Sequence, residues 1–286
     1  MYRFAKNYIK QKVARKLNGD EVDFSSYPVV HDKVDLGDMV SHDVVFLLTT
    51  GRSGTKTLIE YLKENSGYCA IHAPKPSLAT LGSLLWKKKV SEDSAQWAYF
   101  SAREKYLYEL CRRGVPLIDG DCKNLPLLPA LSDFFPNSKF VHVVRNPLDF
   151  VISGLDRGYF VDKDPLLWGH LFLRDDESLA LSFEEQVMLI ADFWEIANRI
   201  AEITEEKVGG HRFLTLKSEN MFKDSEEIAK TFSGLGYKSF KRIKNGPAPV
   251  LNRNLTSSSY DISLVKCIIK DRCPSAKRYY PEVLVS

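Results

Sequence analysis

Apolar residues follow two patterns along the chain, and the two patterns alternate. Short, mainly apolar runs predict strands over 43–48, 68–72, 115–118, 139–144 and 212–216, and the continuous apolar run in 43–48 is typical of a central strand. Longer segments predict helices after the loop 49–57 as far as Gly67, and over 93–113, 125–135, 183–208, 225–235 and 261–273. Strands that alternate with helices predict an α/β fold in three layers, with a central parallel sheet flanked by helices.

Residues 1–42 differ from this alternating region. The first 17 residues are basic and amphipathic, and residues 18–42 are polar and turn-rich. We therefore predict a basic N-terminal helix and an extended lead-in over 1–42, followed by a single domain over 43–286. Residues 159–181 are aromatic and acidic without a clear period, and we interpret them as an insertion. The basic segment is compatible with contact to an anionic membrane surface, but packing on its own domain is the expectation.

Composition excludes several classes of protein. The formal net charge of the 286 residues is only +3, which argues against a nucleic-acid coat. No apolar run approaches the ~18 residues of a transmembrane helix, and no secretory signal is recognisable. The five cysteines are scattered without a Cys-x-x-Cys pair, so a zinc framework is not expected. Reduced thiols in a cytoplasmic protein are the simplest interpretation.

The junction between the first strand and its helix carries the strongest chemical signal. Residues 49–57 read Thr-Thr-Gly-Arg-Ser-Gly-Thr-Lys-Thr, with two glycines, two cations and five hydroxyls. Backbone N–H groups and the helix dipole converge at such a junction, and glycines let the backbone approach an anion. The loop is not a Walker A motif, because Thr50 and Thr55 stand where that motif has glycines. It predicts a site for a phosphate or sulfate group.

A second junction of the same kind follows the strand 139–144. Arg145 lies at its mouth, Asn146 suits an N-cap, and Pro147 suits the first helical position. Ser153 lies on the new helix, where its hydroxyl can face the strand end that bears Arg145. Ligands of parallel sheets bind at the carboxyl ends of the strands, so the two junctions can serve one ligand.

The two junctions, in this order, resemble the nucleotide-binding motifs of the PAPS-dependent sulfotransferases, of the bacterial and carbohydrate type. The resemblance identifies the loop Arg52, Ser53, Gly54, Thr55, Lys56 and Thr57 with the 5′-phosphosulfate site, and Arg145 and Ser153 with the 3′-phosphate site. Residues 214–222 are similar to a strand-then-Glu-Asx-Leu stretch of the family, whereas Asn146 stands where the family more often has Asp. The resemblance covers roughly 43–240 and implies the P-loop-like sulfotransferase fold.

The resemblance implies transfer of a sulfuryl group from PAPS to an acceptor hydroxyl or amine, with release of PAP and without a metal. It assigns Arg52 to the leaving group and Lys56 to the 5′-phosphate, with the hydroxyls of Thr55 and Thr57 as further donors. Lys123 matches a strand-end lysine that related enzymes place near the sulfuryl group. Arg253 lies in a late basic loop of the kind that closes over PAP in related enzymes.

The general base is less well defined. Many bacterial members read His-Glu-Pro after the second strand, but this chain reads His72-Ala73-Pro74 and lacks the acid. His72 is the first candidate, because an ordinary histidine pKa of about 6.5 suits proton transfer. Asp119 and Asp121, at the end of the next strand, are rivals. His142 lies in mid-strand, and we expect it to be a core residue.

Two other functions remain open at this point. The segment 115–119 resembles a Walker B strand, so a P-loop kinase that uses Mg²⁺ and ATP is the chief alternative. A non-enzymatic membrane or adaptor protein would use the basic N-terminus instead. For a sulfotransferase without an anchor, the expected acceptor is a small metabolite, a natural product or a saccharide precursor. Trp168, Phe172 and their neighbours in the insertion are candidates to line the acceptor site. The sequence does not indicate an oligomeric state.

Overall fold

A computed structural model describes residues 22–65, 67–161, 181–223, 225–237 and 260–284 of the chain. The basic N-terminal segment, most of the predicted insertion with Trp168 and Phe172, and Arg253 lie outside these residues. In the described part, no helix combines the length and the apolar character needed to cross a membrane.

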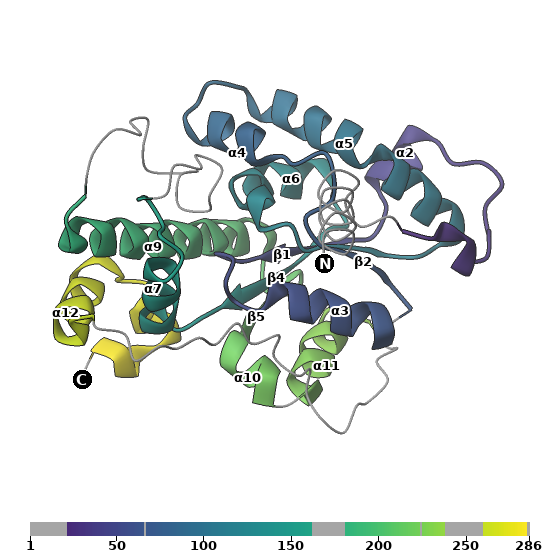
Figure 1. Cartoon of the computed structure of the whole chain (residues 1–286). Helices are drawn as coiled ribbons and strands as arrows, with labels where there is room; N and C mark the ends of the chain where they lie inside the picture. The colour runs from purple at the N-terminus through teal and green to yellow at the C-terminus, as the bar shows by residue number, and fades with distance from the viewer. Residues whose placement is uncertain (1–21, 66, 162–180, 224, 238–259, 285–286) are drawn as a thin grey trace, which may run out of the picture.

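The predicted parallel sheet is confirmed, and it forms the middle of the molecule (Figure 1). Its five strands lie in the order β2-β3-β1-β4-β5, and every pair of neighbours is parallel. Their bounds are β1 (Val44–Leu48), β2 (Cys69–Ile71), β3 (Leu117–Asp119), β4 (Lys139–Val144) and β5 (Phe213–Lys217). The order makes β1 and β4 neighbours, so the two junctions predicted to bind anions lie side by side at the same edge of the sheet.

Helices cover both faces of the sheet, because its central strands are apolar on both sides. Along β1, Val44, Phe46 and Leu48 enter one core, and Val45 and Leu47 enter the other. The smaller core lies under α3 (Thr55–Asn65), α10 (Ser218–Lys223) and α11 (Ser225–Gly234). The larger core lies under α2 (Leu36–Val40), α4 (Ala79–Trp86), α5 (Glu92–Arg113), η2 (Cys122–Leu127), α6 (Leu128–Phe134), α7 (Pro147–Leu155), α9 (Phe183–Val208) and α12 (Ile262–Arg272).

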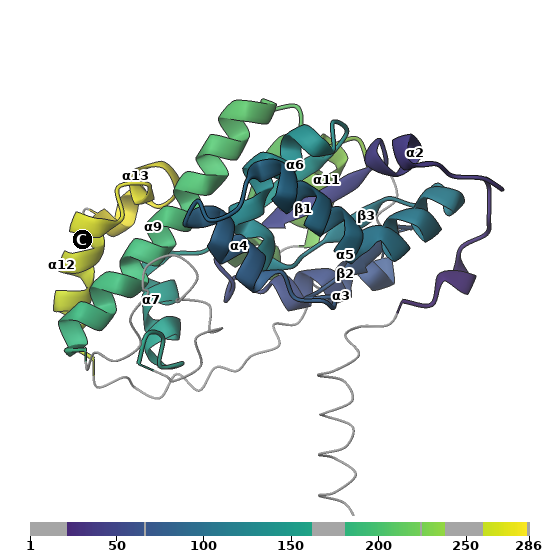
Figure 2. The ribbon, with the colours of Figure 1, turned by 90° about the horizontal axis from the view of Figure 1, so that it is seen from above.

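The C-terminal segment continues beyond α12 through α13 (Ala276–Tyr279) and η3 (Pro281–Leu284). Figure 2 shows α12 and α13 beside α9. The backbone N–H and the hydroxyl of Ser275 both donate to the Glu195 carboxylate of α9, each at 2.9 Å. These two bonds fix the segment against the long helix.

Several predicted elements agree with the structure, and the differences have local causes. The helix 183–208 has the predicted bounds, since Ser182 and Glu185 form a capping box at its start. The predicted helix 125–135 is instead a 3-10 helix, η2, followed by α6, with Pro126 inside the former and Pro129 in the first turn of the latter. The lead-in is not wholly extended, because it contains η1 (Phe24–Ser26) and α2, and α4 was not predicted at all.

Candidate active site

The loop after β1 has a backbone that suits an anion. Gly51, Arg52 and Gly54 have positive φ angles of 73°, 57° and 81°, in the left-handed region. Left-handed residues beside ordinary ones turn successive N–H groups toward a common point, which forms an anion-binding nest. For Arg52 this conformation is uncommon, and such residues concentrate at functional sites.

The hydroxyls of this loop mostly hold the loop itself. Thr49 Oγ1 accepts the Gly51 N–H at 3.1 Å and lies 2.7 Å from Ser53 Oγ and 3.4 Å from Thr55 Oγ1. Thr50 Oγ1 donates to the Gly51 carbonyl at 2.8 Å. Ser53 is completely buried. The hydroxyl of Ser53 therefore lies in the interior of the loop, and the group that Ser53 can offer an anion is its backbone N–H.

Helix α3 begins where the loop ends. The Leu58 N–H donates to the Gly54 carbonyl at 3.0 Å, so the N–H groups before it precede the helical ladder and lie at the positive end of the dipole. A Cβ added to Gly54 would lie 2.3 Å from Phe222 Cζ and 2.9 Å from Met221 Cε. Glycine is therefore required here both for φ and for the close approach of Phe222.

The structure brings the two predicted half-sites into direct contact. Arg52 Nε donates to Ser153 Oγ on α7 at 3.1 Å. Arg145 Nη1 donates to the backbone carbonyl of Arg52 at 2.6 Å. Arg145 and Ser153 follow Arg52 in the sequence by 93 and 101 positions, and the three residues form one cationic cluster at the carboxyl edge of the sheet.

This cluster has an excess of positive charge. Burial lowers the pKa of Arg52, and the nearby charges of Arg157 and Arg145 lower it further. An arginine still keeps its proton under these conditions. Three guanidinium groups that repel one another favour an anion in their midst, because the anion reduces that repulsion.

The ends of β2 and β3 at this edge are organised by a buried arginine on α5. Arg103 is fully buried, and its Nε lies 3.4 Å from Asp119 Oδ2 at the end of β3. Its Nη1 donates at 3.0 Å to the carbonyl of Pro76, in the segment that follows β2 and His72. Arg103 therefore ties together the segments that carry His72 and Lys123.

The two aspartates that follow β3 have different surroundings. Asp119 accepts the Tyr99 hydroxyl and the Asp121 N–H, each at 2.9 Å, in addition to Arg103. Asp121 Oδ1 accepts the Lys123 N–H at 3.1 Å, whereas its Oδ2 has no hydrogen-bond partner among the described residues. Burial and the neighbouring Asp119 raise the pKa of Asp121 to about 6. Asp119 is occupied by structural bonds, whereas Asp121 keeps one buried oxygen without a hydrogen bond, 3.7 Å from Arg103 Nη2.

Two further predicted residues have defined positions. Lys56 lies on the outer side of α3, where its side chain is 65% exposed and its Nζ is 3.8 Å from Glu60. His142 is buried in β4, as expected of a core residue, and its ring lies 5.2 Å from that of Tyr279. Burial lowers the pKa of His142 to about 3. His142 is therefore neutral at physiological pH.

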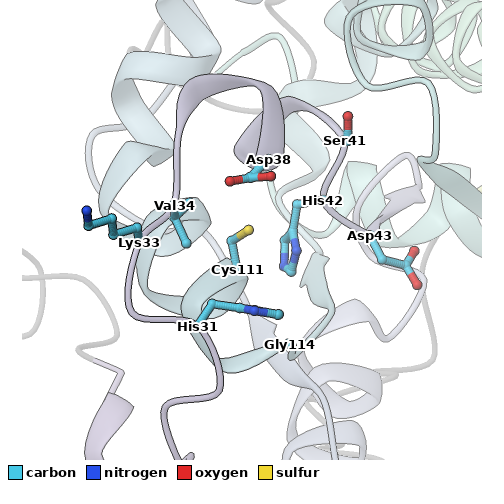
Figure 3. A pocket seen from close by; sticks show the side chains of 9 residues that line it. All are labelled: His31, Lys33, Val34, Asp38, Ser41, His42, Asp43, Cys111 and Gly114. Carbon is cyan, nitrogen blue, oxygen red and sulfur yellow. The ribbon is translucent and has the colours of Figure 1, made fainter.

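Two hollows lie at the opposite, amino edge of the sheet, and none of the predicted site residues lines them. In one, of about 310 Å³, the side chains of His31, His42 and Cys111 face the hollow from three separate segments (Figure 3). Within the described residues, no group of three or more such side chains has the arrangement of a metal site. The predicted chemistry is confined to the carboxyl edge.

Comparison with known proteins bears on the same residues. A sequence profile of the sulfotransferase family matches residues 44–231, from β1 through α11. The chain belongs to the sulfotransferase family. The match includes the loop at Arg52, the turn at Arg145 and the β5–α10 stretch. No curated protein sequence is similar enough to this sulfotransferase to match it.

One solved structure supports the fold, and two others are reported with it. A sulfotransferase from Alicyclobacillus acidocaldarius is 14% identical, with a TM-score of 0.51, over 82% of this chain and 94% of that one. The sulfotransferase domain of the Synechococcus PCC 7002 olefin synthase is 16% identical, with a TM-score of 0.46, over 79% and 87%. The sulfotransferase domain from the curacin biosynthetic pathway is 14% identical, with a TM-score of 0.45, over 79% and 90%.

Some residues of this edge were missed in the sequence. Arg103 had a signal, because it occupies the apolar stripe of α5 between Tyr99 and Leu107, where a charge needs a buried partner. Arg157 follows Ser153 by four positions without any motif. Tyr159 lies in the predicted insertion, and its buried hydroxyl has no hydrogen-bond partner among the described residues. Arg157 and Tyr159 are recognisable only once the chain is folded.

Proposed function

We propose that the protein transfers a sulfuryl group from PAPS to a hydroxyl or amine of a small-molecule or saccharide acceptor and releases PAP. The observation that carries the proposal is the contact between the two cationic junctions, Arg52 with Ser153 and Arg145 with Arg52. A nucleotide with phosphate groups on both its 3′ and 5′ sides fits a pair of adjacent anion sites better than a nucleotide with one phosphate chain. Membership of the sulfotransferase family supports the reaction class.

In this proposal the loop and the start of α3 bind the 5′-phosphosulfate. Backbone N–H groups of residues 53–57 supply most donors. Lys56 points outward to Glu60 in this structure, and its proposed contact with the 5′-phosphate requires its side chain to turn away from Glu60. The Arg52 guanidinium stabilises the charge that develops on the leaving phosphate, a role worth roughly 10²–10³ in rate for one well-placed donor. Arg145 and Ser153 bind the 3′-phosphate.

Binding at Ser153 has a consequence for Arg52. The Ser153 hydroxyl accepts from Arg52 Nε at 3.1 Å and can still donate its own proton to a 3′-phosphate. Ser153 would thereby hold both the nucleotide and the Arg52 side chain, which keeps that guanidinium beside the nucleotide. Lys123 lies on the acceptor side, and Arg253, which is outside the described residues, is proposed to close over PAP.

His72 and Asp121 remain the candidate bases. Asp119 is the weaker candidate, because its oxygens already accept from Tyr99, Arg103 and a backbone N–H. The same contacts speak against a kinase in which Asp119 holds Mg²⁺, since its lone pairs are committed. The pH dependence of the transfer rate is measured for the His72→Ala and Asp121→Asn variants. The variant that lacks the general base should have a low rate and should lose the limb of the pH–rate profile that reports the pKa of that base.

The test combines binding with transfer. PAP binding is measured by calorimetry without Mg²⁺, and transfer of radiolabelled sulfate from PAPS is measured with a metabolite extract as acceptor. We expect PAP binding, labelled product, and at least a roughly 100-fold lower rate for Arg52→Ala. Arg199→Ala is the matched control, because Arg199 is an exposed arginine on α9 paired with Glu202. Phosphorylation that requires Mg²⁺ and ATP, without PAP binding, would overturn the proposal.

A further inference from the structure

The turn that carries Arg145 is held at three consecutive residues by side chains from elsewhere in the chain. The Val144 carbonyl lies 3.1 Å from the Tyr280 hydroxyl, and the Arg145 carbonyl accepts the Trp194 indole N–H at 2.9 Å. The Asn146 N–H donates to Glu219 Oε1 at 3.0 Å. The last sheet pairing of β4 is Val144 with Lys217, so these bonds take over where the sheet ends.

Glu219 connects two of these contacts. Its Oε1 accepts from Asn146, and its Oε2 accepts the Tyr280 hydroxyl at 2.7 Å. A carboxylate that accepts at both oxygens has a fixed plane, so Tyr280 determines where Glu219 presents Oε1 to the turn. Asn146 is in turn the N-cap of α7, the helix that bears Ser153. Tyr280 and the nucleotide site are thus linked by two hydrogen bonds.

The phenol is suited to this task. Tyr280 is 3% exposed, and burial together with the Glu219 charge raises its pKa, so that the hydroxyl remains a donor at any pH at which the protein works. Since the hydroxyl has one proton, the charged and closer Glu219 receives it, and Val144 contributes the weaker contact. Ser275 fixes the preceding segment to Glu195 of α9, so Tyr280 is itself well placed.

We propose that Tyr280 is a positioning residue for the 3′-phosphate half of the nucleotide site, and that it acts through Glu219. The inference rests on the proposed function, because it concerns affinity for PAP and PAPS. Arg145 already lies 2.6 Å from the Arg52 carbonyl, so a small displacement of its backbone changes the reach of its guanidinium. The C-terminal segment therefore completes the nucleotide site as well as the core.

The adjacent residue provides a matched control. Tyr279 is also buried, but its hydroxyl has no hydrogen-bond partner among the described residues. Tyr280→Phe and Tyr279→Phe each remove one buried hydroxyl from neighbouring positions. We expect Tyr280→Phe to raise the Kd for PAP and the KM for PAPS about tenfold, with kcat at saturating PAPS within about twofold of wild type. Tyr279→Phe should leave all three quantities within about twofold.

A purely structural role predicts a different result. It would lower the thermal midpoint of Tyr280→Phe without changing the PAP affinity of the folded protein. Equal PAP binding by Tyr280→Phe and wild type would therefore overturn this inference and leave the proposed function intact. Failure of the wild-type protein to bind PAP would overturn the proposed function and this inference with it. The route through Glu219 is tested in the Glu219→Ala background, where Tyr280→Phe should add less than twofold. A further tenfold loss there would refute that route.

Discussion

Replacement of Asp121 by asparagine should stabilise the protein at neutral pH. Asp121 is buried beside Asp119, its pKa is raised to about 6 from 3.8, and its Oδ2 lies 3.7 Å from Arg103 Nη2 without a hydrogen bond. Each pKa unit corresponds to about 1.4 kcal/mol, so the ionised carboxylate costs the folded state about 3 kcal/mol. The Asp121→Asn variant removes this charge and keeps an oxygen for the Lys123 N–H.

The sign of the pH dependence follows from the direction of the shift. Because the folded pKa lies above the unfolded value, the folded state holds a proton that the unfolded state has lost between about pH 4 and pH 6. Wild-type stability therefore falls through that window as pH rises. Asparagine does not titrate, so the advantage of Asp121→Asn should grow from about 1 kcal/mol at pH 4.5 to about 3 kcal/mol at pH 7.5, a difference that already includes the attraction of Arg103 for the ionised carboxylate.

The measurement is urea denaturation of wild type and Asp121→Asn at the two pH values. Asp119→Asn is the control, since Asp119 accepts from Tyr99 and a backbone N–H and neutralises Arg103, so its loss should destabilise the protein at both. A pH-independent difference for Asp121→Asn, or lower stability than wild type at pH 7.5, would refute the reasoning. Other groups that titrate in this range are common to both proteins and cancel in the comparison.

Three more predictions concern the nucleotide site and the core. Gly54→Ala should abolish measurable PAP binding in calorimetry, because its Cβ would lie 2.3 Å from Phe222 in a left-handed conformation; near-normal affinity would contradict the close approach. Ser153→Ala should weaken PAP binding by about tenfold while it frees the Arg52 side chain, and an unchanged Kd would remove Ser153 from the site. His142→Phe should reduce the loss of stability below pH 6, because His142, with a pKa of about 3, must be neutral in the folded state; an unaltered acid-unfolding midpoint would argue against this.

The parts of the fold that could be predicted from sequence are those set by local patterns. The continuous apolar run of β1 indicated a central strand, and Gly114 ends α5 in the left-handed conformation that favours glycine. The neighbouring position of Arg52 and Arg145 followed from two strand–helix junctions of the same kind in a parallel sheet. The helix α4 gave less signal, because its eight residues carry no charge and include Gly82, where an added Cβ would lie 3.1 Å from the Lys123 carbonyl oxygen.

The contacts that could not be predicted are those between residues distant in sequence. Nothing in the local sequence indicates that Tyr280 reaches Glu219, or that the buried Arg103 on α5 is the partner of Asp119. From the sequence alone, Asp119 and Asp121 could not be ranked as candidates for the general base. Only the three-dimensional contacts separate them, since one carboxylate is surrounded by donors and the other keeps an oxygen without one.

The bond between Tyr280 and the Val144 carbonyl spans 136 residues, which has a consequence for biosynthesis. All five strands of the sheet have been translated by Lys217, so a nascent chain can assemble the sheet while the turn at Arg145 still lacks its phenol partner. Such an intermediate would have an assembled sheet but would lack the core residues of α12 and α13, and it would bind the proposed nucleotide poorly. Competence for the co-substrate should arise late in synthesis, after the sheet itself is in place.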